Sequence, residues 1–346
     1  SDLVAQVPNL EGKTLLLVED NLLNQQIAKE LLSPTKATIV LADNGEQAVY
    51  HATQTHSQFD LVLMDIQMPV LDGVTATQQI RKLRSSDVLP IIAMTAHAFE
   101  EEKQRCFDAG MNAHLSKPIL PAQLYELLTQ WLHIEDFVDM KAEQLSKESP
   151  CHAGAGGVCL EDLTMMNLSE ALLLLGDSRE LLVESLCLFA ADYADAPAQL
   201  ASLMSSDREG ALRYAHTLKG LTATFAMQDI SQGFAVIEKA LSQDDQPLAQ
   251  ATLSEAFMAQ YADMMRLVQA LCAQTDDATP ASDADWTEVR STLLEHLENF
   301  SGDSLDYFEA HRAVFEQQLS ATAYRRLTSA LQNIDFDDAQ LAIKEA

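Results

Sequence analysis

The sequence of 346 residues predicts a multidomain protein in which a doubly wound α/β domain precedes an all-helical part. Three observations lead to this fold class. Residues 13–133 alternate β-rich apolar runs with amphipathic ones, which favours a five-stranded parallel sheet with helices on both faces. Residues 160–275 show long helical periodicity instead, which favours a helical bundle. Segments rich in small residues separate the parts, and the length exceeds that of one ordinary core.

The elements of the α/β domain are predicted to follow one another as strand and helix, five times. The expected strands are TLLLVED, ATIVLA, FDLVLMDI, PIIAMTA and AHLSKP, at residues 14–20, 37–42, 59–66, 90–96 and 113–118. The expected helices lie at residues 21–33, 44–54, 73–83, 100–110 and 121–132.

The remaining segments are predicted to be linkers and a small helical tail. We expect residues 1–12 to be a linker remnant, 134–159 a flexible linker and 276–285 a second linker. Residues 286–346 show several short helical patterns whose role the sequence does not define. The chain begins at Ser1, so we expect an excised piece of a longer protein. A linker of about 20 residues has an r.m.s. span of roughly 25 Å, which lets the flanking domains touch in several orientations.

The charge balance is strongly acidic. The chain has 22 Lys and Arg against 52 Asp and Glu, a formal net charge of −30, and the acidic excess holds in every predicted domain. A surface that binds nucleic acid or an anionic membrane needs a basic patch, so neither is an expected partner. The sequence also has no bilayer-spanning apolar run and no signal-peptide pattern. We therefore expect protein partners and a cytoplasmic location, with the cytoplasmic part of a membrane-bound sensor as an alternative.

The cysteine pattern predicts a reducing compartment. The five cysteines are odd in number and form no CxxC pair, which argues against a disulfide framework and against zinc. Cys151 and His152 with Cys159 lack a nearby fourth metal ligand. The cysteines are Cys106, Cys151, Cys159, Cys187 and Cys272.

Polar side chains follow the predicted strands of the α/β domain. They are Glu19, Asp20, Asp65, Thr95 and Lys117. Because the carboxyl ends of parallel strands meet at one edge of the sheet, we expect these side chains to gather there. Three carboxylates repel one another unless a cation neutralises them, and Mg²⁺ suits oxygen ligands and phosphate. Any one of these acidic residues, taken alone, is as well explained as a solvated loop residue as by a functional role. Five polar groups in this order at strand ends argue for a site.

The same residues suit phosphoryl transfer. The Asp65 carboxylate can act as a nucleophile and form an acyl phosphate. We expect Mg²⁺ on Glu19, Asp20, Asp65 and the backbone carbonyl of Gln67, with Pro69 and Gly73 shaping the loop after Asp65. The Thr95 hydroxyl and the Lys117 ammonium group would hold the remaining phosphoryl oxygens.

These motifs resemble the receiver domain of two-component signalling. The resemblance rests on LLLVEDN, LVLMDIQMPVLDG, AMTAHA and HLSKPI and covers residues 13–133. It implies a flavodoxin-like fold, Asp65 as phospho-acceptor, Glu19 and Asp20 as Mg²⁺ ligands, Thr95 as switch hydroxyl and Lys117 as the family's lysine. His114 departs from the pattern, because many receivers have Phe or Tyr there.

A helix in the second domain carries His216 in the stretch LRYAHTLKGLTATFA, residues 212–226. At about 100° per residue, Tyr214, Leu218, Leu221 and Phe225 share one arc about 60° wide, and His216 lies about 170° from its centre. We therefore expect His216 to face water, rather than to be a satisfied core histidine. Ala215, Lys219, Gly220 and Ala223 are expected around it, with small residues giving clearance and Lys219 neutralising phosphate charge.

AHTLKG resembles the motif of the histidine phosphotransfer (HPt) domain, a four-helix bundle, over residues 160–275. The resemblance implies His216 as the phosphohistidine and Lys219 as its charge partner. Leu221 and Ala226 depart from it, and Leu221 is expected to point inward. We expect Leu212 and Met227 to form an apolar rim on which a receiver docks. Together the two domains resemble the C-terminal part of a bacterial hybrid sensor histidine kinase.

The sequence thus predicts a phosphorelay module. Asp65 would accept phosphate from an upstream histidine kinase domain, and His216 would pass it to a downstream response-regulator receiver, or the reverse. No ATP-binding motif is recognisable, so the chain cannot start the relay, and transfer within one chain or between chains stays open. The alternative is a phosphorylation-regulated binding module in which His216 is idle. A phosphatase is disfavoured because Gln67 stands where a second acid would follow Asp65.

A second carrier histidine in the tail is not favoured. The candidates are His296 and His311, and His311 is followed by Val314 and Phe315 at the places of the motif's Lys and Gly.

Overall fold

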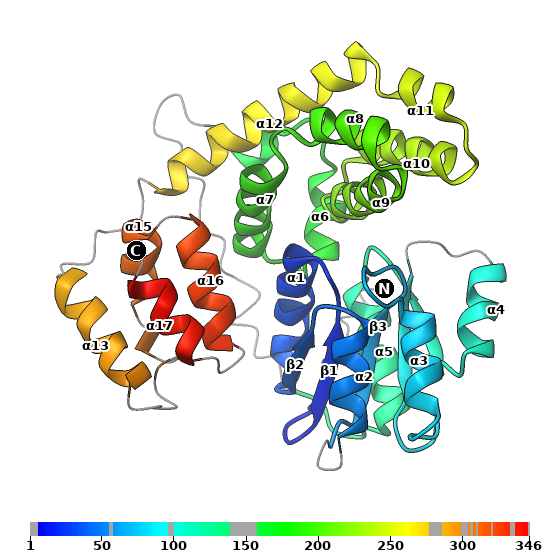
Figure 1. Ribbon diagram of the computed structural model, residues 1–346, viewed down its shortest axis with the longest axis vertical. Coiled ribbons are helices and arrows are strands. Elements are labelled where there is room, and N and C mark those ends of the chain that lie inside the picture. Colours follow the sequence, from blue (N-terminus) through cyan, green and yellow to red (C-terminus); the bar gives the residue numbers. More distant parts are fainter. Residues whose placement is uncertain are drawn as a thin grey trace. The chain divides into compact units, whose positions relative to one another are not determined.

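The structure is a computed structural model of the chain, and it forms two compact units, Ser1–Cys272 and Ala273–Ala346 (Figure 1). It describes residues 6–54, 58–95, 100–138, 158–276, 286–298, 304, 307–308, 311–319, 321–332 and 336–344. Most of both predicted linkers, and the pair Cys151 and His152, lie outside the described residues.

The first domain of unit 1 confirms the predicted doubly wound fold. Its five strands are parallel and ordered β2-β1-β3-β4-β5. The strands are β1 (Thr14–Val18), β2 (Thr38–Ala42), β3 (Leu61–Asp65), β4 (Ile91–Thr95) and β5 (Ala113–Ser116). The helices are α1 (Leu22–Leu32), α2 (Gly45–Thr53), α3 (Gly73–Arg81), α4 (Glu100–Asp108) and α5 (Pro121–Leu132), with a short 3-10 helix at Ser33–Thr35.

The central strands are largely apolar up to their last residues because helices cover both sheet faces. Alternate residues of β1 enter different cores: Leu15 and Leu17 pack with α1 and α5, whereas Leu16 and Val18 pack with α2 and α3. This two-sided burial leaves the carboxyl edge of the sheet as the place where polar side chains emerge.

The segment before β1 differs from the linker that we expected. Val7 and Leu10 are buried, Pro8 forms an isolated bridge with Phe137, and the Asn9 amide donates to the Asp136 carbonyl at 3.0 Å. The described part of this segment is therefore packed on the α/β domain, because its apolar side chains complete the core beside α5.

The second domain of unit 1 is all-helical, as predicted. It begins with a 3-10 helix at Leu160–Asp162 and continues with α6 (Leu168–Leu174), α7 (Arg179–Tyr193), α8 (Ala196–Ser206), α9 (Arg208–Thr224), α10 (Gln228–Ser242), α11 (Gln246–Thr252) and α12 (Glu255–Asp276). Asp207 begins α9 by accepting a hydrogen bond from the Gly210 amide. Helix α9 packs against both α8 and α10, around the buried rings of Phe189, Phe225 and Phe234.

A disulfide joins Cys187 of α7 to Cys272 of α12. The expectation of no disulfide framework is therefore wrong for this pair, and the cysteines no longer support the expected reducing compartment. Spacing along the chain did not reveal it, because the two cysteines are 85 residues apart and only helix packing brings their Cα atoms to 5.5 Å.

We expect reduction of this disulfide to lower the free energy of unfolding of the helical domain by about 3–5 kcal/mol, because it releases a long closed loop in the unfolded chain. Urea denaturation followed by circular dichroism, with and without dithiothreitol, measures the change. A Cys187→Ser variant is the control and should not respond to the reductant. Equal midpoints for the oxidised and reduced protein would contradict the prediction.

Unit 2 has a helical core of its own. Its described helices are α13 (Trp286–Glu298), α15 (Arg312–Gln318), α16 (Ala321–Gln332) and α17 (Phe336–Lys344). Phe308, Phe315 and Leu327 lie at the centre of its core. His311 stacks on Tyr307 with ring centroids 4.2 Å apart.

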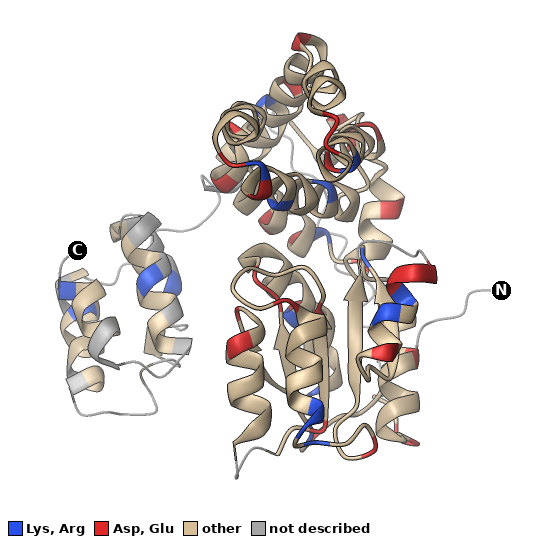
Figure 2. Cartoon of the chain, turned by 45° about the vertical axis from the view of Figure 1, so that its right-hand side comes forward, with Lys and Arg blue, Asp and Glu red and all other residues tan. Residues whose placement is uncertain are grey.

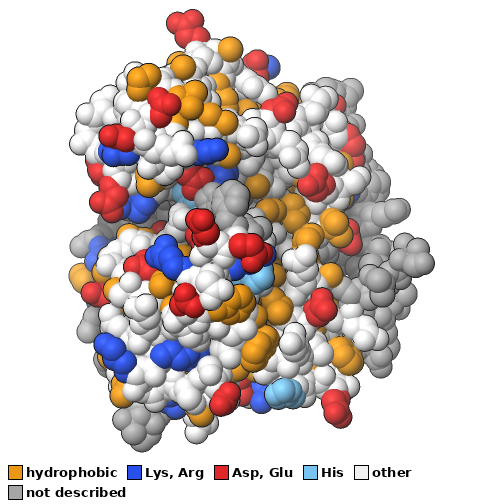
Figure 3. Space-filling view, turned by 90° about the vertical axis from the view of Figure 1, so that its right-hand side faces the viewer, with side chains coloured by type: hydrophobic (Ala, Val, Ile, Leu, Met, Phe, Trp, Pro, Cys, Tyr) orange, Lys and Arg blue, Asp and Glu red, His pale blue; other side chains and the backbone are white. Residues whose placement is uncertain are grey.

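The described surface mixes both signs of charge. Figure 2 shows Lys and Arg interspersed with the more frequent Asp and Glu, and the face in Figure 3 adds apolar side chains between them. Among the described residues, no helix is long and apolar enough to cross a membrane.

Candidate functional site

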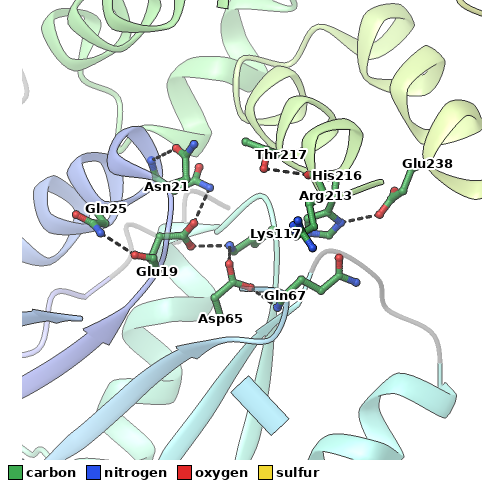
Figure 4. A network of polar contacts seen from close by, with 11 residues as sticks. Glu19, Asn21, Gln25, Asp65, Gln67, Lys117, Arg213, His216, Thr217 and Glu238 are labelled. Atoms are coloured by element: carbon green, nitrogen blue, oxygen red, sulfur yellow. Dashed lines mark hydrogen bonds and ion pairs between the residues drawn. The ribbon is translucent and has the colours of Figure 1, made fainter. Parts of the chain in front are cut away.

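An acidic cluster lies at the carboxyl edge of the sheet (Figure 4). Glu19 and Asp20 follow β1, and Asp65 ends β3. One carboxylate oxygen from each lies within 4.8 Å of the others, and Glu19 and Asp65 are buried. The Lys117 ammonium group, just after β5, donates to Glu19 Oε2 at 2.6 Å and to Asp65 Oδ2 at 2.7 Å. The structure thus brings four of the predicted groups together.

The electrostatics of this cluster favour a cation. Burial raises the pKa of Glu19 to about 7, although Lys117 opposes it. Burial and then Asp65 raise the pKa of Asp20 to about 6. Burial alone would lower the pKa of Lys117, but Asp65 and Glu19 outweigh it and raise that pKa. Lys117 therefore stays charged, but its single positive charge does not neutralise three carboxylates.

The loop after β3 fixes the Asp65 side chain. The Gln67 amide donates to Asp65 Oδ1 at 3.2 Å, and the Gly73 amide donates to the Ile66 carbonyl at 3.0 Å. A Cβ atom at Gly73 would lie 2.0 Å from the Asp65 carbonyl oxygen, so only glycine lets α3 begin this close to the strand.

Thr95 lies at the same edge, whereas His114 lies further back in β5, paired with Ala93 of β4. Thr95 ends β4 and is buried, and its carbonyl accepts the Lys117 amide at 2.6 Å. Thr95 does not line the cleft that contains Asp65 and His216. His114 on β5 meets Phe107 edge-on at 6.2 Å between ring centroids, and burial lowers its pKa.

The second part of the site is a triad of polar side chains on α9 and α10. His216 Nδ1 lies 2.6 Å from Glu238 Oε1, and Lys219 Nζ donates to Glu238 Oε2 at 2.6 Å. Burial works against the Glu238 charge, but hydrogen bonds from His216 and Lys219 prevail and lower its pKa to about 2. An ionised carboxylate only accepts hydrogen bonds, so Nδ1 is the donor to Glu238. Whenever the ring is neutral, Nε2 is therefore the nitrogen with the lone pair.

The helical wheel was partly wrong about α9. Leu218, Leu221 and Phe225 are buried as expected, but Tyr214 is only half-buried. Ala215 and Lys219 are buried rather than exposed, and the His216 side chain is 12% exposed and faces a cleft instead of open water. The wheel assumed one apolar face, whereas α9 packs on α8 and α10 and is also covered on the His216 side.

The predicted apolar docking rim does not exist as expected. Met227 is fully buried at the start of α10, and Leu212 packs half-buried against the core. Gly220, in contrast, lines the cleft, and a Cβ atom there would meet no atom within 4 Å.

Asp65 and His216 line one cleft inside unit 1. It is partly open to solvent. The α/β domain contributes Glu19, Asp20, Asn21, Asn24, Asp65, Gln67 and Lys117, and α9 contributes Arg213, His216, Thr217 and Gly220. The Asp65 carboxylate and the His216 imidazole therefore border one space, which is also lined by the cationic side chains of Lys117 and Arg213.

Sequence reasoning missed Glu238. It lies on the apolar face of α10, among Phe234, Ile237 and Leu241, and is 6% exposed. An ionisable group at a core position of a helix requires a buried cationic partner, and this is the signal that could have found it.

Two protein-family models match the sequence of this chain. Residues 15–129 match the response regulator receiver domain, and residues 182–303 match the Hpt domain. The chain therefore contains a receiver domain followed by an HPt domain and is a two-component phosphorelay module. The Hpt match extends past the helical domain into unit 2.

The chain is also similar to sensor histidine kinases. The sensor histidine kinase GacS of Pseudomonas protegens is 31% identical over 235 residues, 67% of this chain and 24% of its own length. The signal transduction histidine-protein kinase BarA of Escherichia coli K12 is 41% identical over 118 residues, 34% of this chain and 13% of its own. The chain spans between 5% and 24% of the first relatives that it matches.

Among solved structures, the receiver domain of sensor histidine kinase PA1611 from Pseudomonas aeruginosa PAO1 is similar. It is 39% identical, with 35% of this chain and 98% of that chain covered, and a TM-score of 0.33. That structure has a magnesium ion coordinated in its active site cleft.

Proposed function

We propose that the chain relays a phosphoryl group between Asp65 and His216. Asp65 accepts it from the histidine of an upstream kinase domain, and His216 passes it to the receiver of a downstream response regulator, or the relay runs in reverse. The observation that carries this proposal is that the Asp65 carboxylate and the His216 imidazole line the same cleft. We further propose a cytoplasmic location, where kinase and regulator domains meet.

The acidic cluster fits Mg²⁺. Three carboxylate oxygens within 4.8 Å, on acids whose pKa values are raised, match the hard oxygen ligands of this cation. Glu19, Asp20 and Asp65 would hold it with the backbone carbonyl of Gln67. The bound cation would neutralise charge on the phosphoryl oxygens. Lys117 and the hydroxyl of Thr95 would bind the remaining oxygens.

The transfer step balances without an external acid or base. The lone pair of His216 Nε2 attacks phosphorus, and the bond from phosphorus to the Asp65 carboxylate oxygen breaks. The electron pair of that bond stays on the Asp65 carboxylate. In the neutral ring Nε2 has no proton to lose, because the single ring proton is on Nδ1, which donates to Glu238. The ring becomes positively charged as the N–P bond forms, and the Glu238 carboxylate stabilises this charge.

We assign Lys219 a positioning role in addition to the expected role as charge partner of the phosphohistidine. Its ammonium group donates to Glu238 at 2.6 Å and is buried, so we assign it to orienting that carboxylate beside His216. It lies three residues after His216, one turn along α9, which keeps positive charge close to the phosphoryl group as well.

We expect Mg²⁺ to bind at least about tenfold more weakly at pH 5.5 than at pH 8, because protons then compete for the raised pKa values of Glu19 and Asp20. A raised carboxyl pKa means that the folded protein without metal loses stability as the pH rises from about 4.5 to 7, so Mg²⁺ should also raise Tm more at pH 8. Calorimetric titration at both pH values measures the affinity. The Asp20→Asn variant, which lacks one proposed ligand, is the control and should bind Mg²⁺ more weakly at both pH values. Equal affinities would contradict the prediction.

Replacing His216 with Gln tests the proposed function. We expect phosphate on Asp65 to form from acetyl phosphate as in the wild type, and delivery to a downstream receiver to stop, because Gln has no nucleophilic nitrogen. Label on both proteins is followed by autoradiography. If the variant still delivers phosphate, His216 is not a carrier and the chain is a phosphorylation-regulated binding module instead.

A further inference from the structure

A hydrogen bond joins the receiver domain to the HPt domain beside the cleft. Asn21 Nδ2 donates to the Tyr193 hydroxyl at 2.7 Å. Asn21 follows the acid pair Glu19 and Asp20, and its Oδ1 accepts the Asn24 amide at 3.0 Å to begin α1. Because one side-chain amide serves both bonds, the Tyr193 hydroxyl is fixed relative to the first turn of α1 and to the acidic cluster.

The Tyr193 side of this contact is rigid. Its ring stacks on Phe189 with centroids 5.3 Å apart and lies 6.2 Å from Tyr214 of α9. Its carbonyl accepts the buried Tyr261 hydroxyl at 2.7 Å, and burial raises the pKa of the Tyr193 phenol. The hydroxyl that meets Asn21 therefore stays neutral, and contacts with α9 and α12 as well as with its own helix α7 fix the position of Tyr193.

Apolar packing continues from one domain into the other below this hydrogen bond. Leu23, Ile27 and Leu31 of α1 belong to the same buried cluster as Leu182 and Leu186 of α7. A Cβ atom at Gly176, just before α7, would meet the Leu31 side chain at 3.5 Å. Helix α1 thus packs on its own sheet and also contacts α7 of the HPt domain.

We infer that Asn21 and α1 dock the receiver on the HPt domain of the same chain, with Tyr193 as the fixed partner. Transfer between Asp65 and His216 then takes place within one chain. A receiver from another protein reaches His216 only after this receiver leaves, because both need the same side of α9. This inference rests on the proposed function and adds to it that transfer occurs within one chain rather than between chains. A tethered partner favours this route because its effective concentration is high.

A pair of full-length variants separates the two routes. A donor chain with His216→Gln is loaded on Asp65 with radiolabelled acetyl phosphate and Mg²⁺. An acceptor chain with Asp65→Asn supplies His216 but keeps its own receiver in place. In the acceptor chain, Asn21→Ser keeps an oxygen for the helix start and removes the donor to Tyr193. Tyr193 of the acceptor remains available to Asn21 of the donor.

We expect opposite signs for the same substitution. Asn21→Ser in the acceptor should raise the rate of transfer between chains about 5- to 10-fold, because the acceptor's own receiver competes less. In the donor it should lower that rate by a similar factor, with the loading of Asp65 measured to correct for any change there. Tyr214→Phe in the acceptor is the matched control and should leave the rate unchanged, since that hydroxyl bonds Gln199 within the HPt domain.

In the wild-type chain, transfer should follow first-order kinetics whose rate does not depend on protein concentration. An unchanged or lower rate with Asn21→Ser in the acceptor overturns the inference, and so does a wild-type rate that rises with concentration. Absence of any label on His216 in every pair, the wild type included, would instead refute the proposed function.

Discussion

Replacing Lys117 with Met is expected to lower the rate of Asp65 phosphorylation by acetyl phosphate at least about 100-fold, because a charged donor to the reacting groups is lost. The ammonium group now bridges Glu19 and Asp65 at 2.6 and 2.7 Å. Without it, three clustered carboxylates repel one another and a charged phosphate donor. Formation of the acyl phosphate, read as hydroxylamine-sensitive label, measures the effect.

The control for the Lys117 variant is Lys103→Met. Lys103 forms an ion pair with Glu100 within α4 and does not line the described cleft, so this change removes an equal charge outside the cleft. We expect it to keep phosphorylation within about twofold. An equal loss for both variants would show that net charge, and not the bridge in the acidic cluster, controls the reaction.

Replacing Glu238 with Ala is expected to slow transfer from Asp65 to His216 about 100-fold, whereas Glu238→Gln should slow it about tenfold. The Gln carbonyl oxygen can still accept the hydrogen bond from Nδ1–H and keep the tautomer, but it cannot stabilise a positively charged ring. Ala does neither. Single-turnover transfer rates give the loss, and ¹⁵N chemical shifts of the His216 ring report which nitrogen is protonated.

The two Glu238 variants also separate positioning from packing. The prediction requires the Nδ1-protonated form in the wild type and in Glu238→Gln, and a mixture of tautomers in Glu238→Ala. Equal rates in all three proteins, or an unchanged tautomer in Glu238→Ala, would mean that Glu238 does not position the histidine.

The sequence predicted the receiver fold well because its signal is local. Each strand is a short apolar run, and the rule that polar groups gather at the carboxyl edge is enough to bring together Glu19, Asp65 and Lys117. The buried inward position of Leu221 also follows from helical period alone.

The HPt surface was harder to predict because its features depend on contacts between distant elements. Met227 and Lys219 are buried by helices that a single wheel does not represent. Glu238 is 22 residues from His216, and Asn21 is 172 residues from Tyr193. The disulfide between Cys187 and Cys272 is a similar case, since only the packing of α7 on α12 makes it.

The central claim is that one phosphoryl group moves between Asp65 and His216, and rapid-quench kinetics on the wild-type chain test it most directly. Acyl phosphate is labile in alkali, whereas phosphohistidine is stable there, so the two forms are counted separately in each sample. We predict that alkali-labile label on Asp65 decays at the rate at which alkali-stable label appears on His216, and that Asp65→Asn abolishes both. Alkali-stable label that never forms, or that forms equally in Asp65→Asn, would contradict the account.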